Sequence, residues 1–203
     1  FIMLGFPDTF FAGFDLTILR WFHKLAECGG IVFTPFFSIL SMLGKWGLAM
    51  ILCGGILCLF SKTRKCGFSI LLSLALCALF TNCLAKPLIG RLRPYLRYEE
   101  IAVYWQAVGS PMQSDASFPS GHTAAASAFA VAVFLAQGKR WLWFAFVFPL
   151  LMGCSRLYLM VHYPTDILGG FLFGVLAALL AAWLVRKLWD QDSNSFAWRR
   201  KKS

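Results

Sequence analysis

Five long apolar runs constrain this chain more than any other feature, because each has close to the roughly 20 residues that a helix needs to cross a bilayer. The runs are residues 35–60, 67–85, 121–137, 141–160 and 166–186. With 59% hydrophobic and 14% charged residues, the 203-residue chain is too apolar for a water-soluble monomer or a disordered protein. The sequence therefore predicts an all-α fold: a polytopic membrane helix bundle of about five spans, forming a single membrane-embedded domain over residues 1–203.

Glycines mark two local features of these runs. The first run is interrupted by Gly44-Lys45-Trp46-Gly47, which predicts either one tilted helix or a shorter span with a lead-in. In the last run, Gly170 and Gly174 form a small-residue pair one helical turn apart. Such a pair favours close helix packing.

The N-terminal segment 14–28 mixes apolar and charged side chains. Phe14 and Trp21 belong to its apolar set, and Asp15 and Arg20 belong to its polar set. This pattern predicts an interfacial helix, although a helix packed on the bundle fits equally well. Residues 1–6 are too short for a further span, so five spans and an outward N-terminus are expected if the chain is complete.

The distribution of basic residues indicates the orientation in the membrane. Lys and Arg follow the first, third and last runs, at Lys62, Arg64, Lys65, Lys139, Arg140, Arg186 and in the basic tail 187–203. These regions are expected in the cytoplasm, so the connections 86–120 and 156–165 face the extracytoplasmic side of the plasma membrane. The net charge of +10 is then explained by loops and by contact with the lipid bilayer, without a nucleic-acid partner.

The outward connections nevertheless hold cations that oppose this bias. Lys86, Arg93 and Arg156 are three such cations, each beside the end of an apolar run. Any one of them alone is explained by a side chain that snorkels to the interface. Together they would repel one another unless a multiply anionic group lay between them, and a phosphate is the natural counterpart.

The start of the third run suits the same ligand. Ser120 and Gly121 lie where a helix begins, so the first backbone amides are unpaired and the positive end of the helix dipole points outward. Glycine lets a ligand approach the backbone closely. A serine N-cap without a ligand is the simpler alternative.

Two histidines carry the candidate chemistry. Asp166 follows His162 by four residues, with Pro164 between them, so the two side chains can meet across a turn. The carboxylate would fix the imidazole tautomer and leave the second nitrogen free as a nucleophile, although Asp166 also suits a helix cap. His122 starts a helix without a neighbouring carboxylate, which suits a proton donor.

These clusters resemble the K-x6-RP, PSGH and SR-x5-H-x3-D signature of the type 2 phosphatidic acid phosphatase superfamily, and the resemblance covers about residues 15–186. It implies a lipid phosphatase without metal or cofactor. The phosphoryl group would be held by Lys86, Arg93, Arg156, Ser120 and Gly121. His162 would attack phosphorus to give a phosphohistidine, Asp166 would orient it, and His122 would protonate the departing oxygen and later activate water.

The resemblance implies undecaprenyl diphosphate as the lipid phosphate substrate, converted to undecaprenyl phosphate and phosphate. Phosphatidate and phosphatidylglycerophosphate are the alternatives. A membrane lipid or phosphate transporter is the alternative of another class, but it would not need the pair His162 and Asp166. The sequence assigns no role to Lys45, Arg91 or Arg97 and no oligomeric state.

Overall fold

The structure, a computed structural model, describes residues 10–200, without the side chains of Trp46 and of residues 190–200. Predictions about residues 1–6 and about the side chains of the basic tail beyond residue 189 lie outside the described part. All five apolar runs are helical, and the described residues contain no strand. The chain is therefore a helical multi-pass membrane protein.

Four stretches are long and apolar enough to cross a membrane, namely Ala12–Leu43, Arg64–Arg97, Lys139–Tyr158 and Pro164–Trp189. Two apolar helices are shorter, Leu48–Leu59 and Gly121–Gln137. The elements in chain order are α2 (Ala12–Leu43), η1 (Lys45–Gly47), α3 (Leu48–Leu59), α4 (Arg64–Ala78), the π-helical segment η2 (Leu79–Ala85), α5 (Lys86–Ile89), α6 (Pro94–Arg97), α7 (Glu99–Ala107), α8 (Gly121–Gln137), η3 (Lys139–Trp141), α9 (Leu142–Tyr158) and α10 (Pro164–Arg200).

The first predicted span is divided between two helices. It comprises the second half of α2, the short η1 and α3, and Gly47 takes a left-handed conformation at φ 65° just before α3. Glycine tolerates this conformation, which ends η1 and changes the direction in which the chain enters α3. The alternative of one tilted helix is therefore wrong, whereas the shorter span with an extracytoplasmic lead-in stays a prediction.

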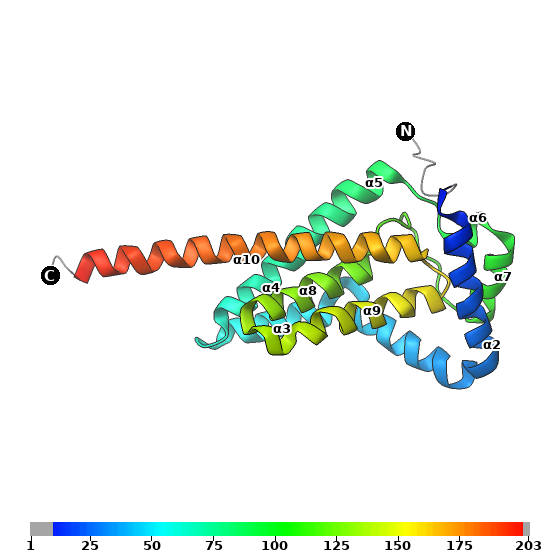
Figure 1. Ribbon diagram of the computed structural model, residues 1–203, viewed down its shortest axis with the longest axis horizontal. Helices are drawn as coiled ribbons and strands as arrows, with labels where there is room; N and C mark the ends of the chain where they lie inside the picture. The colour runs from blue at the N-terminus through cyan, green and yellow to red at the C-terminus, as the bar shows by residue number, and fades with distance from the viewer. Residues whose placement is uncertain (1–9, 201–203) are drawn as a thin grey trace.

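The N-terminal half of α2 lies across one end of the bundle (Figure 1). Gly29 breaks the helical geometry with φ −147° and separates this half from the part that runs along the bundle. Phe14 and Trp21 are 51% and 61% exposed, so an apolar face points away from the protein, as an interfacial helix requires. Arg20 pairs with Glu100 of α7 through two hydrogen bonds of 2.9 and 2.8 Å, so this half also packs on the bundle.

One residue of this segment contradicts the sequence pattern. Asp15 was expected on the polar, solvent-facing side but is fully buried, with Leu19 and Phe22 on the same face. The three residues follow the i, i+4, i+7 spacing of a buried helical stripe. The carboxylate therefore faces the protein interior, where it needs a partner.

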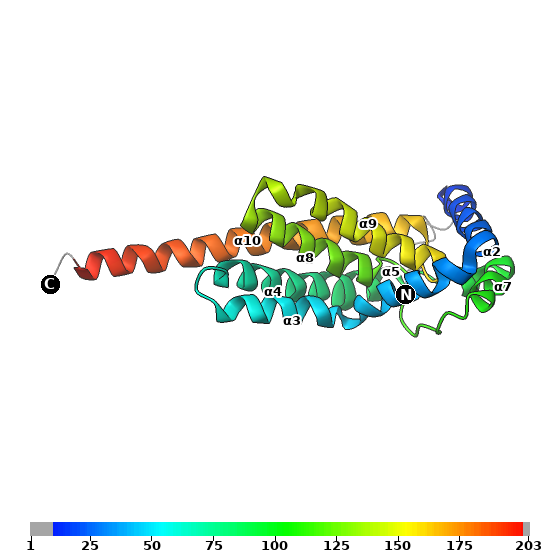
Figure 2. The ribbon, with the colours of Figure 1, turned by 90° about the horizontal axis from the view of Figure 1, so that it is seen from below.

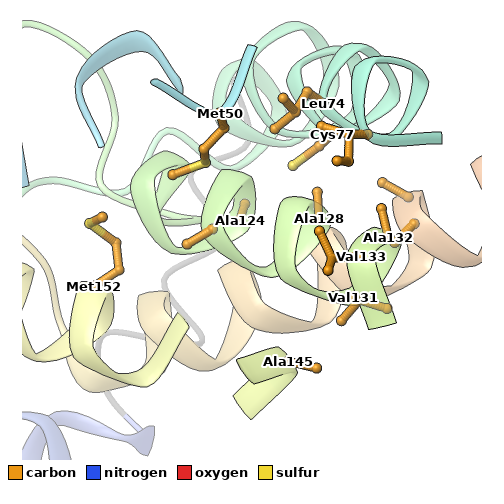
Figure 3. Packing of buried hydrophobic residues seen from close by; sticks show 14 of the residues in the cluster. Met50, Leu74, Cys77, Ala124, Ala128, Val131, Ala132, Val133, Ala145 and Met152 are labelled. Atoms are coloured by element: carbon orange, nitrogen blue, oxygen red, sulfur yellow. The ribbon is translucent and has the colours of Figure 1, made fainter. Parts of the chain in front are cut away.

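Helix α8 lies among α4, α9 and α10 in the bundle (Figure 2). Its buried face is mostly alanine, as at Ala124, Ala128 and Ala132 (Figure 3). A methyl group built at Gly174 of α10 would lie 2.5 Å from Cβ of Ser127 and even closer to the carbonyl oxygen of Ala124. The predicted close packing at Gly170 and Gly174 is thus confirmed.

We expect Gly174→Leu to destabilise the bundle, because the new side chain would meet the backbone of α8 and force the helices apart. Overpacking of this kind costs roughly 1–3 kcal/mol. Thermal unfolding of the purified protein in detergent measures the effect. Gly55→Leu in α3 is the matched control, since a side chain there meets nothing within 4 Å. Equal unfolding temperatures for the two variants would contradict the packing argument.

The two ends of the bundle differ in character. The α3–α4 connection, with Lys62, lies at the end from which α10 projects, whereas α5, α6 and α7 lie at the other end (Figure 1). The predicted polar clusters all belong to this second end. Alternation of helix direction thus gathers residues from distant parts of the chain on one side.

Candidate active site

His162 and Asp166 meet in the turn between α9 and α10. Nδ1 of His162 lies 3.4 Å from Oδ2 of Asp166, as the spacing predicted. The same oxygen accepts a hydrogen bond from the Ser117 hydroxyl at 2.5 Å and another from the Tyr163 amide at 2.9 Å. Asp166 is therefore not the N-cap of α10 but a first-turn residue whose carboxylate is held from several sides.

The second nitrogen of His162 faces a cation. Nη1 of Arg93 lies 3.4 Å from Nε2 of His162 and donates to the Val161 carbonyl at 2.7 Å. Burial, followed by the charges of Arg93, Arg156 and Lys86, lowers the pKa of His162 well below its usual range. The imidazole is thus neutral at pH 7, with a lone pair on Nε2 if Nδ1 donates to Asp166.

Lys86 and Arg93 share a carboxylate that the sequence analysis missed. Asp115 forms an ion pair with Nζ of Lys86 and accepts a hydrogen bond of 2.7 Å from Nη2 of Arg93. Burial raises the pKa of Asp115, but the hydrogen bond from Lys86 and the charges of both cations lower it to about 2. Asp115 is therefore ionised at neutral pH, and an anion bridges two of the three predicted phosphate-binding cations.

Arg156 extends from the last turn of α9 and is buried. Its Nη1 donates to the hydroxyl of Ser41 in α2, while its Nε is buried without a hydrogen-bond partner among the described residues. A buried guanidinium with an unused N–H group is costly unless a ligand completes its bonding. Nothing in the local sequence of Ser41 indicated this contact.

Ser120 and Gly121 lie at the start of α8 as predicted. The Ser120 hydroxyl caps the helix, because it accepts a hydrogen bond from the Thr123 amide at 3.5 Å. The side chain of Ser120 is therefore the serine N-cap that the sequence offered as the simpler alternative. A methyl group built at Gly121 would lie 3.7 Å from Nζ of Lys86. The first turn of α8 therefore faces the cation cluster through its glycine.

His122 lines a cavity of about 1040 Å³. Lys45, Lys86, Asp115 and Gly121 line the same cavity at its polar end. A side-chain carbon built at Gly44 would lie 2.8 Å from Cδ2 of His122, so the glycine at the end of α2 leaves room for the imidazole. The cavity gives His122 access to whatever binds beside the cations.

A buried network of charged groups lies behind the turn between α9 and α10, and Arg91 is at its centre. Arg91 donates to Asp166 at 2.5 Å and to Asp15 at 2.8 Å, and its guanidinium lies 3.9 Å from the centre of the Tyr163 ring. Asp15 also accepts from the Thr165 amide at 3.0 Å. The N-terminal helix is thereby connected to the carboxylate that contacts His162.

Sequence reasoning had a usable signal for some of the missed residues. Asp15 shares the helical stripe of Leu19 and Phe22, so its spacing indicated burial. Asp115 is a carboxylate in a connection rich in cations, close before Ser120. Arg97, whose role was left open, lies 5.8 Å over the ring of Tyr98 and is exposed.

The fold and the site define a membrane helix bundle with a buried histidine among cations at one end. The sequence profile described as the PAP2 superfamily matches residues 67–190, more than half of the chain and every predicted site residue. The chain therefore belongs to the PAP2 superfamily.

Similar proteins include several phosphatases. Undecaprenyl-diphosphatase from Sulfolobus acidocaldarius is 31% identical over 120 residues, which are 59% of this chain and 55% of the relative. Lipid A 4'-phosphatase from Bacteroides thetaiotaomicron is 36% identical over 110 residues, or 53% of this chain and 48% of the relative. The chain thus spans about half the length of these curated relatives.

A solved structure supports the architecture. The crystal structure of a transmembrane PAP2 type phosphatidylglycerolphosphate phosphatase from Bacillus subtilis has a TM-score of 0.59 and 24% sequence identity to this chain. The comparison covers 91% of this chain and 98% of that one. It shows a common fold along nearly the whole length of both proteins.

Proposed function

We propose that this protein is a phosphatase that removes the terminal phosphate of undecaprenyl diphosphate through a phosphohistidine on His162, at the extracytoplasmic face of the plasma membrane. The observation that carries the proposal is the position of His162, with Nδ1 beside Asp166 and Nε2 beside Arg93. A neutral imidazole fixed in this way presents a lone pair where a phosphoryl group paired with Arg93 would lie.

The phosphoryl group would bind between Lys86, Arg93 and Arg156. The unused Nε of Arg156 supports this role, as does the opening that Gly121 leaves beside Lys86. Cations and backbone amides placed in advance neutralise the charge that grows on the equatorial oxygens in the transition state. Ser120 contributes by starting α8 and aiming its first amides at the site.

The reaction would proceed in two steps. Nε2 of His162 forms a bond to the terminal phosphorus while the bond from that phosphorus to the bridging oxygen of the diphosphate breaks, and protonated His122 gives its proton to that oxygen. Asp166 holds the Nδ1 proton of the resulting imidazolium. A water molecule, losing its proton to His122, then attacks phosphorus, the N–P bond breaks, and both histidines return to their starting states.

The cavity supports a lipid as substrate. Beyond its polar end it is lined by apolar side chains of α3 and α4, including Ile51, Leu71 and Leu74. An apolar chain continuing from the phosphate would lie between these helices in the membrane. A water-soluble phosphate ester would leave this surface without a partner.

A substrate panel tests the proposal. Undecaprenyl diphosphate is supported by the similarity to the undecaprenyl-diphosphatase, and phosphatidylglycerophosphate is the second candidate because the phosphatase of similar fold is named for it. Phosphate release by the purified protein in detergent should give the highest kcat/KM with the prenyl diphosphate, compared with phosphatidate and phosphatidylglycerophosphate. A higher value for either glycerolipid would overturn the substrate assignment. Family membership favours the phosphatase over the transporter alternative.

We expect Asp115→Asn to lower KM and the inhibition constant of phosphate by about tenfold. The carboxylate pairs with Lys86 and Arg93, so it competes with a substrate phosphate for the same cations. A tenfold change corresponds to about 1.4 kcal/mol, a modest value for one charged contact. Glu99→Gln is the matched control, because it removes an exposed carboxylate at the same end. An unchanged or higher KM for Asp115→Asn would show that the carboxylate does not compete.

We expect turnover to survive EDTA and to be inhibited by vanadate. Three side-chain cations supply the charge neutralisation, and vanadate takes the geometry of a phosphoryl group under attack. Phosphate release is measured after dialysis against EDTA, with and without added Mg²⁺. Activity that disappears in EDTA and returns with Mg²⁺ would contradict the proposed mechanism.

A further inference from the structure

A second charged cavity lies at the opposite end of the bundle from the candidate active site. It has a volume of about 530 Å³ and lies between the first turns of α4, the last turn of α8 and the part of α10 around Val185. The α3–α4 connection beside it is at the end from which α10 projects (Figure 1). The cations of this cavity therefore lie at the other end of the bundle from Lys86 and His122, and the cavity has no place in the proposed reaction.

Cations from two distant parts of the chain line this cavity. Lys62 and Lys65 come from the start of α4 and the connection before it, and Arg186 comes from α10. No carboxylate is among the lining residues, and none of the three cations forms an ion pair with a described side chain. Like charges around one hollow repel one another, so an anion in the hollow would stabilise the arrangement.

The backbone of α4 adds to the positive potential. The helix has 15 residues and begins at Arg64, but Thr63 provides no side-chain cap. The Thr63 hydroxyl donates instead to the Leu57 carbonyl at 2.9 Å. The first amides of α4, at the positive end of its dipole, therefore lack the side-chain acceptor that a helix start usually has.

The remaining lining is suited to a molecule that is partly polar and partly apolar. Ser69 and Gln137 supply polar groups, and Leu135 and Val185 supply an apolar wall. Trp189 contributes an aromatic ring, with Nζ of Lys65 at 5.7 Å from its centre. Aromatic rings and cations together are typical of the zone where lipid head groups meet hydrocarbon.

We propose that this cavity binds the phosphate of an anionic phospholipid head group from the leaflet at this end of the bundle. The three cations would pair with the phosphodiester, and the apolar wall would contact the start of the acyl chains. Free inorganic phosphate offers the same charge without the apolar part. The test therefore distinguishes the two sources.

The experiment measures lipid binding by native mass spectrometry of the full chain purified in detergent. The probes are dioctanoyl phosphatidylglycerol, dioctanoyl phosphatidylcholine and inorganic phosphate. The test variant replaces Lys62, Lys65 and Arg186 with glutamine. The control variant replaces Lys139, Arg140 and Lys187 with glutamine. These three cations lie at the same end of the bundle but do not line the cavity.

We expect the test variant to bind phosphatidylglycerol on the order of 100-fold more weakly than the unmodified chain, since each cation that lines the cavity and contacts the bound phosphate would contribute about a fivefold factor. The control variant should stay within about threefold, phosphatidylcholine should bind weakly, and inorganic phosphate should not displace phosphatidylglycerol at equal concentration. Both variants should keep the unmodified turnover and unfolding temperature, because neither touches the active site or the core. Equal weakening in both triple variants, or displacement by inorganic phosphate at equal concentration, would overturn the proposal.

Discussion

Replacing His162 with alanine is expected to abolish phosphate release from every substrate in the panel, with a loss on the order of 10⁴–10⁶-fold, the range found when a nucleophile is removed. The imidazole is the only group that the proposed mechanism assigns to attack on phosphorus. Its Nε2 lies beside Arg93, where the phosphoryl group is proposed to bind. Without the imidazole, water would have to attack phosphorus directly.

The measurement is labelled phosphoenzyme, trapped by a rapid quench in alkaline denaturant and identified by its loss of label in acid, together with the burst of first product. The unmodified chain should form the phosphoenzyme, and the His162→Ala variant should not. His23→Ala is the matched control, because His23 lies on α2, where its ring centre is 3.5 Å from that of Tyr104 and its Nε2 faces Glu27 rather than Arg93. Phosphoenzyme in the His162→Ala protein would assign the nucleophile to another residue.

Replacing His122 with alanine is expected to distinguish substrates by their leaving groups. Cleavage of the monoester phosphatidate expels an alkoxide, a strongly basic oxygen that must be protonated as the bond breaks. Cleavage of a prenyl diphosphate expels a phosphate oxygen that is already stable as an anion. The loss should therefore reach roughly 10²–10⁴-fold on the monoester, the usual contribution of general acid catalysis, and should be much smaller on the diphosphate.

Loss of His122 should also slow the second step, because His122 is the proposed base for the attack of water on phosphohistidine. Slow breakdown of that intermediate would reduce steady-state turnover on both substrates alike. The burst rate of the first product isolates the first step. Equal losses of burst rate on phosphatidate and on the diphosphate would show that His122 is not the proton donor.

The positions of the main site residues along the chain were predictable for a physical reason. An apolar run of bilayer length must form a helix, and short loops force successive helices to alternate in direction. Lys86, Gly121 and Arg156 lie at ends of the apolar runs. The alternation of helix direction places these ends together at one end of the bundle. The turn from His162 to Asp166 has too few residues for the two side chains to be far apart, so their contact was also predictable.

The burial of charged groups was harder to predict. Asp15 and Thr165 are 150 positions apart and yet share two hydrogen bonds. Their pairing depends on how the N-terminal half of α2 lies across the bundle end, which no local spacing specifies. The break at Gly29 and the left-handed Gly47 set that direction.

The sequence by itself determined a bundle of membrane helices and the candidate catalytic residues, because hydrophobic length and motif spacing are properties of the chain alone. Only the tertiary structure decided which charges compensate one another: Asp115 with Lys86 and Arg93, and Arg91 with Asp15 and Asp166. The physical reason is that the energy of a charge depends on the groups within a few ångströms of it and on its burial. Those neighbours come from segments that only folding brings together.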